Sequence, residues 1–173
     1  MREVADRSRI DAFLEALARE ATEETDVFLV GGTSAVLVGW RDATVAIDLV
    51  MRPESDAMLR AIPMLKERLR VNVELASPDQ FIPVPPDWPD RSPVIRRVGK
   101  VTYRHYDFSA QALAKLERGH GRDIADVHAM FDRGLVIRAV LRRLYETIEP
   151  SLCRYPAIDP SSLRRAVDEI APP

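Results

Sequence analysis

Hydrophobic and polar positions in the first fifty residues alternate between helical and strand patterns. Apolar residues recur three and four positions apart between Ser8 and Ala21, which predicts an amphipathic helix. The continuous apolar run over 27–30 predicts a buried strand. A short helix over 33–40 follows, and then a second strand over 44–51 that Arg52-Pro53 closes. The pattern therefore predicts a strand, a turn of small residues, a helix and a second strand in succession.

The middle of the chain combines a helix, a third strand, a loop and a hairpin. Residues 55–69 have a helical pattern, which Pro63 should either kink or restart. Residues 71–75 alternate apolar with polar side chains and predict a strand. Prolines exclude regular structure from the next segment, namely Pro78, Pro83, Pro85, Pro86, Pro89 and Pro93. Strands over 94–97 and 101–108 then predict a hairpin that turns at Gly99.

After residue 108 the pattern is helical almost throughout. Helices are predicted over 109–118, 122–132, 135–148 and 161–170, and glycines separate the first three. The whole order predicts an α+β fold with a mixed sheet of about five strands. We expect residues 1–108 to form the core and residues 109–173 to form a helical region packed on it.

Composition excludes several classes of protein. The chain has 173 residues, of which 46% are hydrophobic, so it can bury a core. A single cysteine, Cys153, excludes a disulfide framework. Residues 1–7 lack the apolar core of a signal peptide, and no apolar run reaches the roughly 20 residues needed to cross a membrane. We therefore expect a cytoplasmic protein without a membrane partner. His105, His120 and His128 lack metal-site spacing and are expected in packing or surface roles.

The net charge of −2 hides an uneven distribution along the chain. Residues 1–90 contain 10 Lys and Arg against 17 Asp and Glu, whereas residues 91–143 contain 12 against 5. A basic segment of this kind suits a polyanion such as nucleic acid or nucleotide phosphates. The alternative interpretation is a set of solvated helix faces that bind nothing.

Four small residues, Gly31, Gly32, Thr33 and Ser34, follow the first predicted strand. Residues without Cβ allow a phosphate to approach the backbone, and hydroxyl groups can donate hydrogen bonds to it. The helix that begins here would direct its N-terminus at such a ligand. An ordinary turn between strand and helix is the alternative interpretation.

The second predicted strand carries a charged residue, Asp48, among apolar neighbours. Such a carboxylate is costly to bury unless it is paired or bound to metal. On a strand, positions 46 and 48 would project from the same face. Position 46 is an alanine, so one side chain of that pair carries no charge.

The glycine turn, the helix and the strand that ends in Asp48 resemble the active site of nucleotidyltransferases of the polymerase-beta superfamily. The resemblance implies that Gly31, Gly32, Thr33 and Ser34 bind the phosphates of an NTP. It implies an Asp-x-Asp pair that holds two Mg²⁺ ions, of which this chain retains only Asp48. Ala46 stands in the position of the other expected aspartate, so we expect impaired or absent catalysis. Glu74, on the third predicted strand, stands where the superfamily has its third carboxylate, with a solvent-facing residue as the alternative.

A second group of residues lies on the predicted helices 109–118 and 122–132. Lys115, Arg118, Arg122 and Asp123 resemble the later motifs of AbiEii-type and MenT-type toxin nucleotidyltransferases. The resemblance implies that Lys115 contacts the triphosphate, that Asp123 is an essential acid and that Arg118 and Arg122 support them. The alternative is two solvated helices with a salt bridge such as Arg122 to Asp126.

The resemblance implies transfer of nucleotides from an NTP to an acceptor hydroxyl. The expected acceptor is the 3′ end of tRNA or another RNA, with Mg²⁺ as cofactor, in a toxin that has a cognate antitoxin. A second hypothesis is a degenerate, non-catalytic module that binds NTP or RNA for regulation. A third is an antitoxin-like member that modifies a protein hydroxyl. The natural residue at position 46 discriminates between the first two, because a native alanine favours the binding module.

Overall fold

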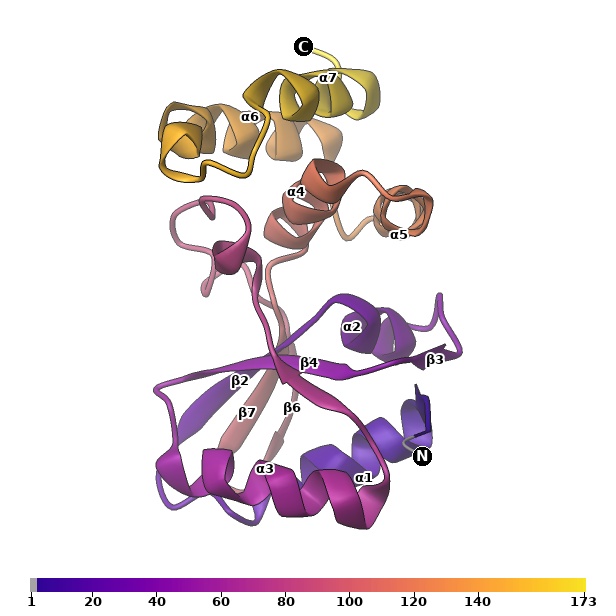
Figure 1. Ribbon diagram of the computed structural model, residues 1–173, viewed down its shortest axis with the longest axis vertical. Coiled ribbons are helices and arrows are strands. Elements are labelled where there is room, and N and C mark those ends of the chain that lie inside the picture. Colours follow the sequence, from indigo (N-terminus) through magenta and orange to yellow (C-terminus); the bar gives the residue numbers. More distant parts are fainter. Residues whose placement is uncertain (1–2) are drawn as a thin grey trace. The chain divides into compact units, whose positions relative to one another are not determined.

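A computed structural model of the protein describes residues 3–173 (Figure 1). Its strands are β1 Ala5–Asp6, β2 Thr25–Val30, β3 Ala43–Thr44, β4 Ile47–Arg52, β5 Val73–Leu75, β6 Val94–Val98 and β7 Val101–His105. Its α-helices are α1 Arg7–Ala18, α2 Gly31–Val38, α3 Asp56–Leu69, α4 Phe108–Arg118, α5 Gly121–Asp132, α6 Arg138–Ile148 and α7 Pro160–Ile170. Two 3₁₀ helices are η1 Pro78–Gln80 and η2 Glu149–Arg154. The predicted α+β class is confirmed.

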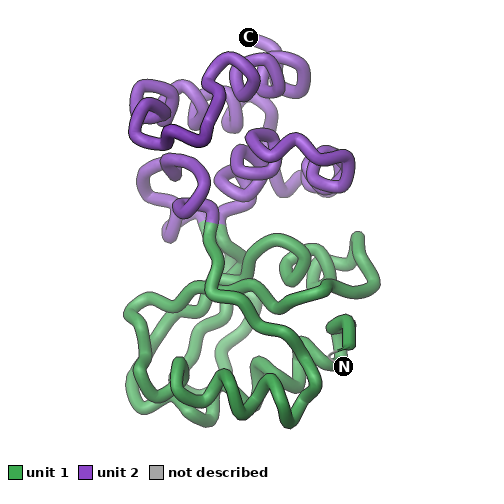
Figure 2. Tube along the Cα trace, viewed as in Figure 1, with its two compact units in different colours: residues 1–77, 92–106 green, residues 78–91, 107–173 purple. Residues whose placement is uncertain are grey.

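The chain divides into two compact units, coloured separately in Figure 2. Unit 1 contains residues 1–77 and 92–106, and unit 2 contains residues 78–91 and 107–173. The proline-rich loop, expected here as part of the core, thus groups with the helical residues. None of the helices that residues 3–173 form is long and apolar enough to cross a membrane.

Unit 1 is built on a five-stranded mixed sheet with the order β5-β4-β2-β7-β6. Strand β2 runs antiparallel to β4 and parallel to β7, and β4 runs parallel to β5. Paired residues on neighbouring strands project from the same face, and successive residues of one strand project from opposite faces. Leu29, Leu49 and Tyr103 therefore belong to one face, and Val30, Asp48 and Glu74 belong to the other.

The face that carries Leu29 and Leu49 is the core face. Helices α1 and α3 cover it (Figure 1), and their apolar side chains join those of the strands in one buried cluster. Phe13 and Leu17 of α1 and Met58 and Leu65 of α3 are fully buried in this cluster. Burial of large apolar side chains is the main favourable contribution to folding. It fixes which sheet face is left to carry polar side chains.

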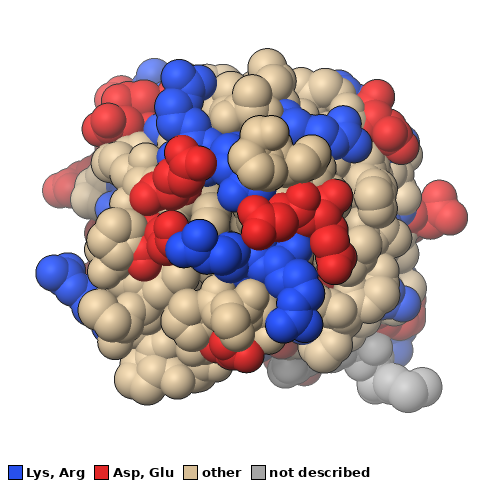
Figure 3. All heavy atoms as spheres, turned by 90° about the horizontal axis from the view of Figure 1, so that it is seen from above, with Lys and Arg blue, Asp and Glu red and all other residues tan. Residues whose placement is uncertain are grey.

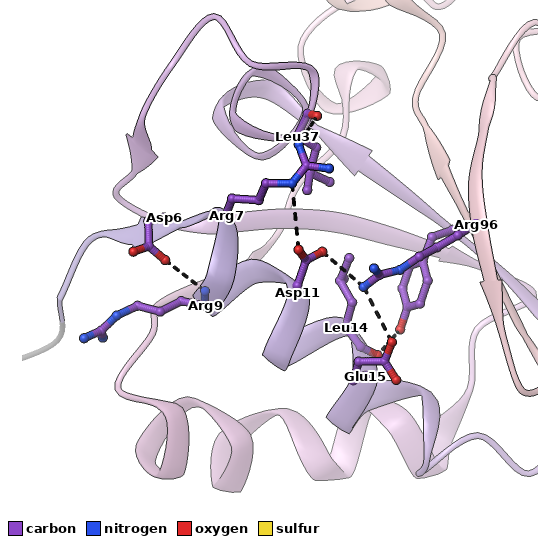
Figure 4. A network of polar contacts seen from close by, with 9 residues as sticks. Asp6, Arg7, Arg9, Asp11, Leu14, Glu15, Leu37 and Arg96 are labelled. Carbon is purple, nitrogen blue, oxygen red and sulfur yellow. Dashed lines mark hydrogen bonds and ion pairs between the residues drawn. The ribbon is translucent and has the colours of Figure 1, made fainter.

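Polar contacts on the flank of α1 hold that helix to its neighbours (Figure 4). Arg96 of β6 forms ion pairs with Asp11 at 3.1 Å and Glu15 at 3.8 Å. Arg7 donates to the carbonyl of Leu37 at 2.8 Å, which joins the start of α1 to α2. These contacts and the apolar cluster fix α1, and through Leu37 the end of α2, in one arrangement.

The second predicted strand, over 44–51, is wrong in its continuity. Residues 43–44 pair with β1, Val45 and Ala46 form a bend, and β4 begins only at Ile47. The carbonyl of Ala46 accepts a hydrogen bond from the hydroxyl of Thr44 at 3.0 Å, within the bend. Because the Ala46 carbonyl accepts this side-chain hydrogen bond, it is not available for backbone pairing with a neighbouring strand. This explains why the strand is interrupted at residues 45–46.

Other predicted elements match closely, with shifted ends. Pro63 lies inside the single helix α3 and does not begin a new one. Strand β7 ends at His105 and not at residue 108, because Asp107 caps the next helix by accepting from the amide of Ser109. The loop over 81–93 is confirmed, and Arg91 fixes it by ion pairing with Asp107 at 2.8 Å and donating to the carbonyl of Pro86 at 2.7 Å.

Candidate active site

The glycine turn of unit 1 lies directly between β2 and α2. Gly31 is the first residue of α2 and has φ +57°, a conformation that favours glycine. A Cβ atom at Gly31 would lie 3.3 Å from the Oδ2 atom of Asp48. The absence of a side chain at Gly31 therefore lets the Asp48 carboxylate lie against the backbone at the start of the helix.

Gly32 is required by packing. A Cβ atom there would lie 2.3 Å from the hydroxyl oxygen of Thr44, a distance that real Cβ atoms do not tolerate. The guanidinium of Arg41 is also close, with its Nη1 atom 3.5 Å from the same Cβ position. The second glycine thus admits Thr44 and Arg41 to the turn, which brings a positive charge beside the N-terminus of α2.

The hydroxyls of Thr33 and Ser34 are fully buried and bonded within the protein. Thr33 Oγ1 accepts from the backbone amide of Asp48 at 2.9 Å. Ser34 Oγ donates to the carbonyl of Leu29 at 2.8 Å. These bonds anchor the first turn of α2 to β4 and β2, so both hydroxyls hold the site in shape.

His105 completes the bonding of Ser34, with its Nδ1 atom 2.9 Å from Ser34 Oγ. Because the hydroxyl proton of Ser34 is directed to Leu29, Nδ1 must be the donor in this bond. Burial lowers the pKa of His105 to about 4, which keeps the imidazole neutral near pH 7. The expected packing role of His105 fits these contacts.

Asp48 and Glu74 are neighbours on adjacent strands. They are paired residues in the parallel ladder of β4 and β5, so both carboxylates project from the same face of the sheet. Asp48 is half-buried and Glu74 is exposed, with Asn72 donating to Glu74 Oε1 at 3.3 Å. Two carboxylates and the glycine turn therefore meet at one end of this face.

Ala46 does not share a strand with Asp48, which corrects the geometry expected from the sequence. It lies in the bend before β4, and only 8% of it is exposed. Across the described residues 3–173, no group of three or more His, Cys, Asp or Glu side chains could hold a metal ion. Within residues 3–173, Asp48 and Glu74 are the two carboxylates that the register of β4 and β5 brings together beside the glycine turn.

The second predicted group of residues lies in unit 2 and forms a buried ion cluster. Lys115 is only 4% exposed, and its ammonium lies 2.7 Å from Asp126 Oδ2 and 3.5 Å from Asp123 Oδ1. Arg118 contacts the same Asp123 oxygen at 2.6 Å. Arg122 is exposed on the surface of α5. The cluster joins α4 to α5, and Lys115 has two carboxylate partners inside the unit.

Charges are intermixed on the face that Figure 3 shows. Lys and Arg side chains there lie next to Asp and Glu side chains (Figure 3). Unit 2 contains ion pairs between Arg142 and Asp168 at 2.6 Å and between Arg164 and Glu149. For this face, solvated helices with mixed charge describe the molecule better than a continuous basic surface.

Sequence reasoning missed Arg41, Thr44 and Asn72. Arg41 and Thr44 lie beside Gly32, and Asn72 binds Glu74. A weak signal existed for the first two, because both lie in the short segment between the glycine turn and Asp48. Nothing in the sequence pattern alone indicated that they fold back onto the turn.

Comparison with known proteins identifies the class. The model of a family described as nucleotidyltransferase of unknown function (DUF6036) matches residues 8–154. Because this match covers most of the chain, the protein belongs to that family of nucleotidyltransferases. No curated protein and no solved structure matches the chain.

Replacing Gly32 with alanine should destabilise unit 1. The new methyl group meets Thr44 at 2.3 Å, and overpacking of this kind costs about 1–3 kcal/mol. Gly121→Ala is the matched control, because a Cβ there meets no atom within 4 Å and should be neutral or stabilising by up to about 1 kcal/mol. Urea denaturation measures both, and equal stability of the two variants would contradict the packing explanation.

Replacing Lys115 with methionine should destabilise the protein by about 3 kcal/mol, because it leaves two buried carboxylates without their ammonium partner. The double variant Lys115→Met/Asp126→Leu removes a charge of each sign and should recover part of this loss. Thermal and urea unfolding of the unaltered protein, these two variants and the single variant Asp126→Leu measures the coupling. Unchanged stability of Lys115→Met would show that the ammonium is not tied into the cluster.

Proposed function

We propose that this nucleotidyltransferase moves a nucleotidyl group from an NTP to the 3′ hydroxyl of an RNA acceptor, with tRNA as the expected acceptor. The observation that carries the proposal is the meeting of Asp48, Glu74 and the Gly31 turn at one end of a sheet face. Carboxylates beside a helix N-terminus suit the chemistry of a triphosphate, whose charge needs cations and backbone amides. The likeness to AbiEii-type and MenT-type proteins supports a role as the cytoplasmic toxin of a toxin–antitoxin system.

Nucleotidyltransferases generally use a divalent metal, and the residues of this site fit one Mg²⁺ ion. Carboxylate oxygens are the ligands that Mg²⁺ prefers, and Asp48 and Glu74 offer them from adjacent strands. When bound, the ion would neutralise charge on the phosphates. We propose Asp48 as its main ligand, since its carboxylate lies against the glycine turn.

The remaining roles follow from the position of each side chain in unit 1. Glu74 is exposed, and its carboxylate oxygen that does not hold the ion can accept the proton of the acceptor hydroxyl, whose oxygen attacks the α-phosphorus as pyrophosphate leaves. The amides at the start of α2 and the guanidinium of Arg41 can bind the outer phosphates. Thr33 and Ser34 position this turn through their hydrogen bonds to Asp48 and Leu29.

The phosphate contact by Lys115 and the acid role of Asp123 are proposals that rest on the resemblance alone. The burial of Lys115 between Asp123 and Asp126 supports a structural role for it instead. Arg118 and Arg122 are more exposed and remain the better candidates for a phosphate contact in this unit.

A non-catalytic module that binds NTP or RNA is the second candidate function. The observation that favours it is Ala46, because the site retains two carboxylates where the superfamily pattern has three. A protein hydroxyl as acceptor is a third candidate. Both alternatives keep the glycine turn, so nucleotide binding alone does not separate them from the first.

Ala46→Asp should create or restore nucleotidyl transfer. The added carboxylate would be buried, so without metal it should lower stability, and Mg²⁺ should recover that stability by binding it. Transfer is measured with each of the four labelled NTPs, total RNA and purified protein as acceptors. Ala46→Asn is the control, with nearly the same shape and no charge.

Labelled RNA with Ala46→Asp but not with Ala46→Asn would support nucleotidyl transfer to RNA. Labelled protein would support transfer to a protein hydroxyl. No label in either acceptor with any NTP, from a folded Ala46→Asp protein, would contradict the catalytic assignment and favour the binding module.

A further inference from the structure

A second polar site lies at the other end of the same strands. A pocket of about 270 Å³ opens where β2 begins and β4 ends, beside the hairpin of β6 and β7. Its polar lining consists mainly of Glu24, Asp26, Arg52, Arg97, Lys100 and Thr102. Nothing in the proposed chemistry at Asp48 uses these residues.

The strand registers place this pocket on the same sheet face as the candidate active site. Asp26 pairs with both Arg52 and Thr102, and Thr102 pairs with Arg97, so four neighbouring strands contribute one row of side chains. Arg52 lies four positions after Asp48 on β4, an even separation, and therefore projects from the same face. At about 3.3 Å per residue, the row lies roughly 13 Å from Asp48 along the strand.

The charges of the pocket favour an anion. Asp26 is paired with Arg104, a residue outside the lining, at 2.9 Å. Glu24 is paired with Arg97 at 2.6 Å, but both side chains are largely exposed, so this pair is weak and can open. Lys100 donates to the carbonyl of Thr22 and forms no ion pair with a carboxylate of residues 3–173. With Arg104 counted, four cations face two carboxylates here.

We propose that this pocket binds a backbone phosphate of the nucleic-acid acceptor, upstream of the end that reacts at Asp48. The inference rests on the proposed function for the reaction at Asp48, but the binding it describes needs no chemistry. The separation of roughly 13 Å corresponds to about four nucleotides of a stacked strand at roughly 3.4 Å each. The small volume suits a phosphate with its sugar and not a whole nucleotide triphosphate.

The test measures binding of a fluorescently labelled single-stranded RNA of mixed sequence to the full-length protein at several salt concentrations. Lys100→Gln and Arg52→Gln should each weaken binding about threefold or more at low salt. Each should also reduce the slope of log K against log salt by about 0.7, the value for one lost phosphate contact on a single strand. The control is Arg60→Gln, which removes the same charge from the exposed surface of α3, the helix that covers the other sheet face.

Unchanged affinity and slope in both pocket variants, or an equal loss in Arg60→Gln, would overturn the proposal. Two further arms identify the source of the phosphate. Inorganic phosphate should displace the RNA no better than chloride at equal ionic strength, and NTP affinity should be unchanged in both variants. Specific displacement by phosphate, or weaker NTP binding, would overturn the acceptor assignment and make the pocket a site for free phosphate or nucleotide.

Two variants separate RNA binding in the pocket from the reaction at Asp48. In an Asp48→Asn background, which removes the proposed reaction, Arg52→Gln and Lys100→Gln should still weaken RNA binding and reduce its salt slope, because the pocket lies at the other end of the face. An inactive Ala46→Asp protein whose RNA binding still depends on Arg52 and Lys100 would refute the reaction while supporting the pocket.

Discussion

The contact between the Asp48 carboxylate and the Gly31 turn is the constraint on which the candidate site depends. It requires a glycine in the left-handed region at the junction of β2 and α2, and it requires β4 to run antiparallel beside β2. The hydrogen bond from the Asp48 amide to the Thr33 hydroxyl fixes the same junction from the other side. A Cβ atom at Gly31 would lie 3.3 Å from the Asp48 carboxylate and crowd it. The position of the carboxylate therefore depends on the glycine at residue 31.

This junction also determines what the rest of the sheet can do. The core face is filled by α1 and α3, which leaves the opposite face to Asp48 and Glu74 at one end and to the basic row at the other. A charged residue within an apolar strand is tolerated here because it projects away from that core. Asp48 and Arg52 lie four positions apart on β4, so both side chains project from the same sheet face. An RNA acceptor that runs along this face would contact both ends of the strand.

Much of the fold was predictable from the sequence, because the spacing of apolar residues indicates which side of a helix or strand is buried. The apolar run of β2, the amphipathic pattern of α1 and the prolines after residue 77 each left one consistent interpretation. The pairing of Asp48 with Glu74 was consistent with the resemblance, although only strand register establishes it. Wherever local pattern and packing agreed, the predicted element was confirmed within a few residues.

The misses share a physical cause, namely contacts between residues that no local pattern reveals. The bend at Ala46 results from side-chain hydrogen bonds to its carbonyl, which interrupt a run that otherwise favours a strand. Lys115 belongs to an amphipathic helix whose polar side could equally have faced solvent, yet it is buried between two aspartates of the next helix. Arg41 reaches the glycine turn only because the chain folds back after α2.

We propose that Asp48 and Glu74 form a site for one divalent ion at the glycine turn. Counting bound Mn²⁺ by electron paramagnetic resonance, in the presence of a non-hydrolysable NTP analogue, tests it most directly. We expect one bound ion per chain, with binding lost in Asp48→Asn and weakened in Glu74→Gln. Two tightly bound ions in the unaltered protein, or one ion that survives Asp48→Asn, would contradict it.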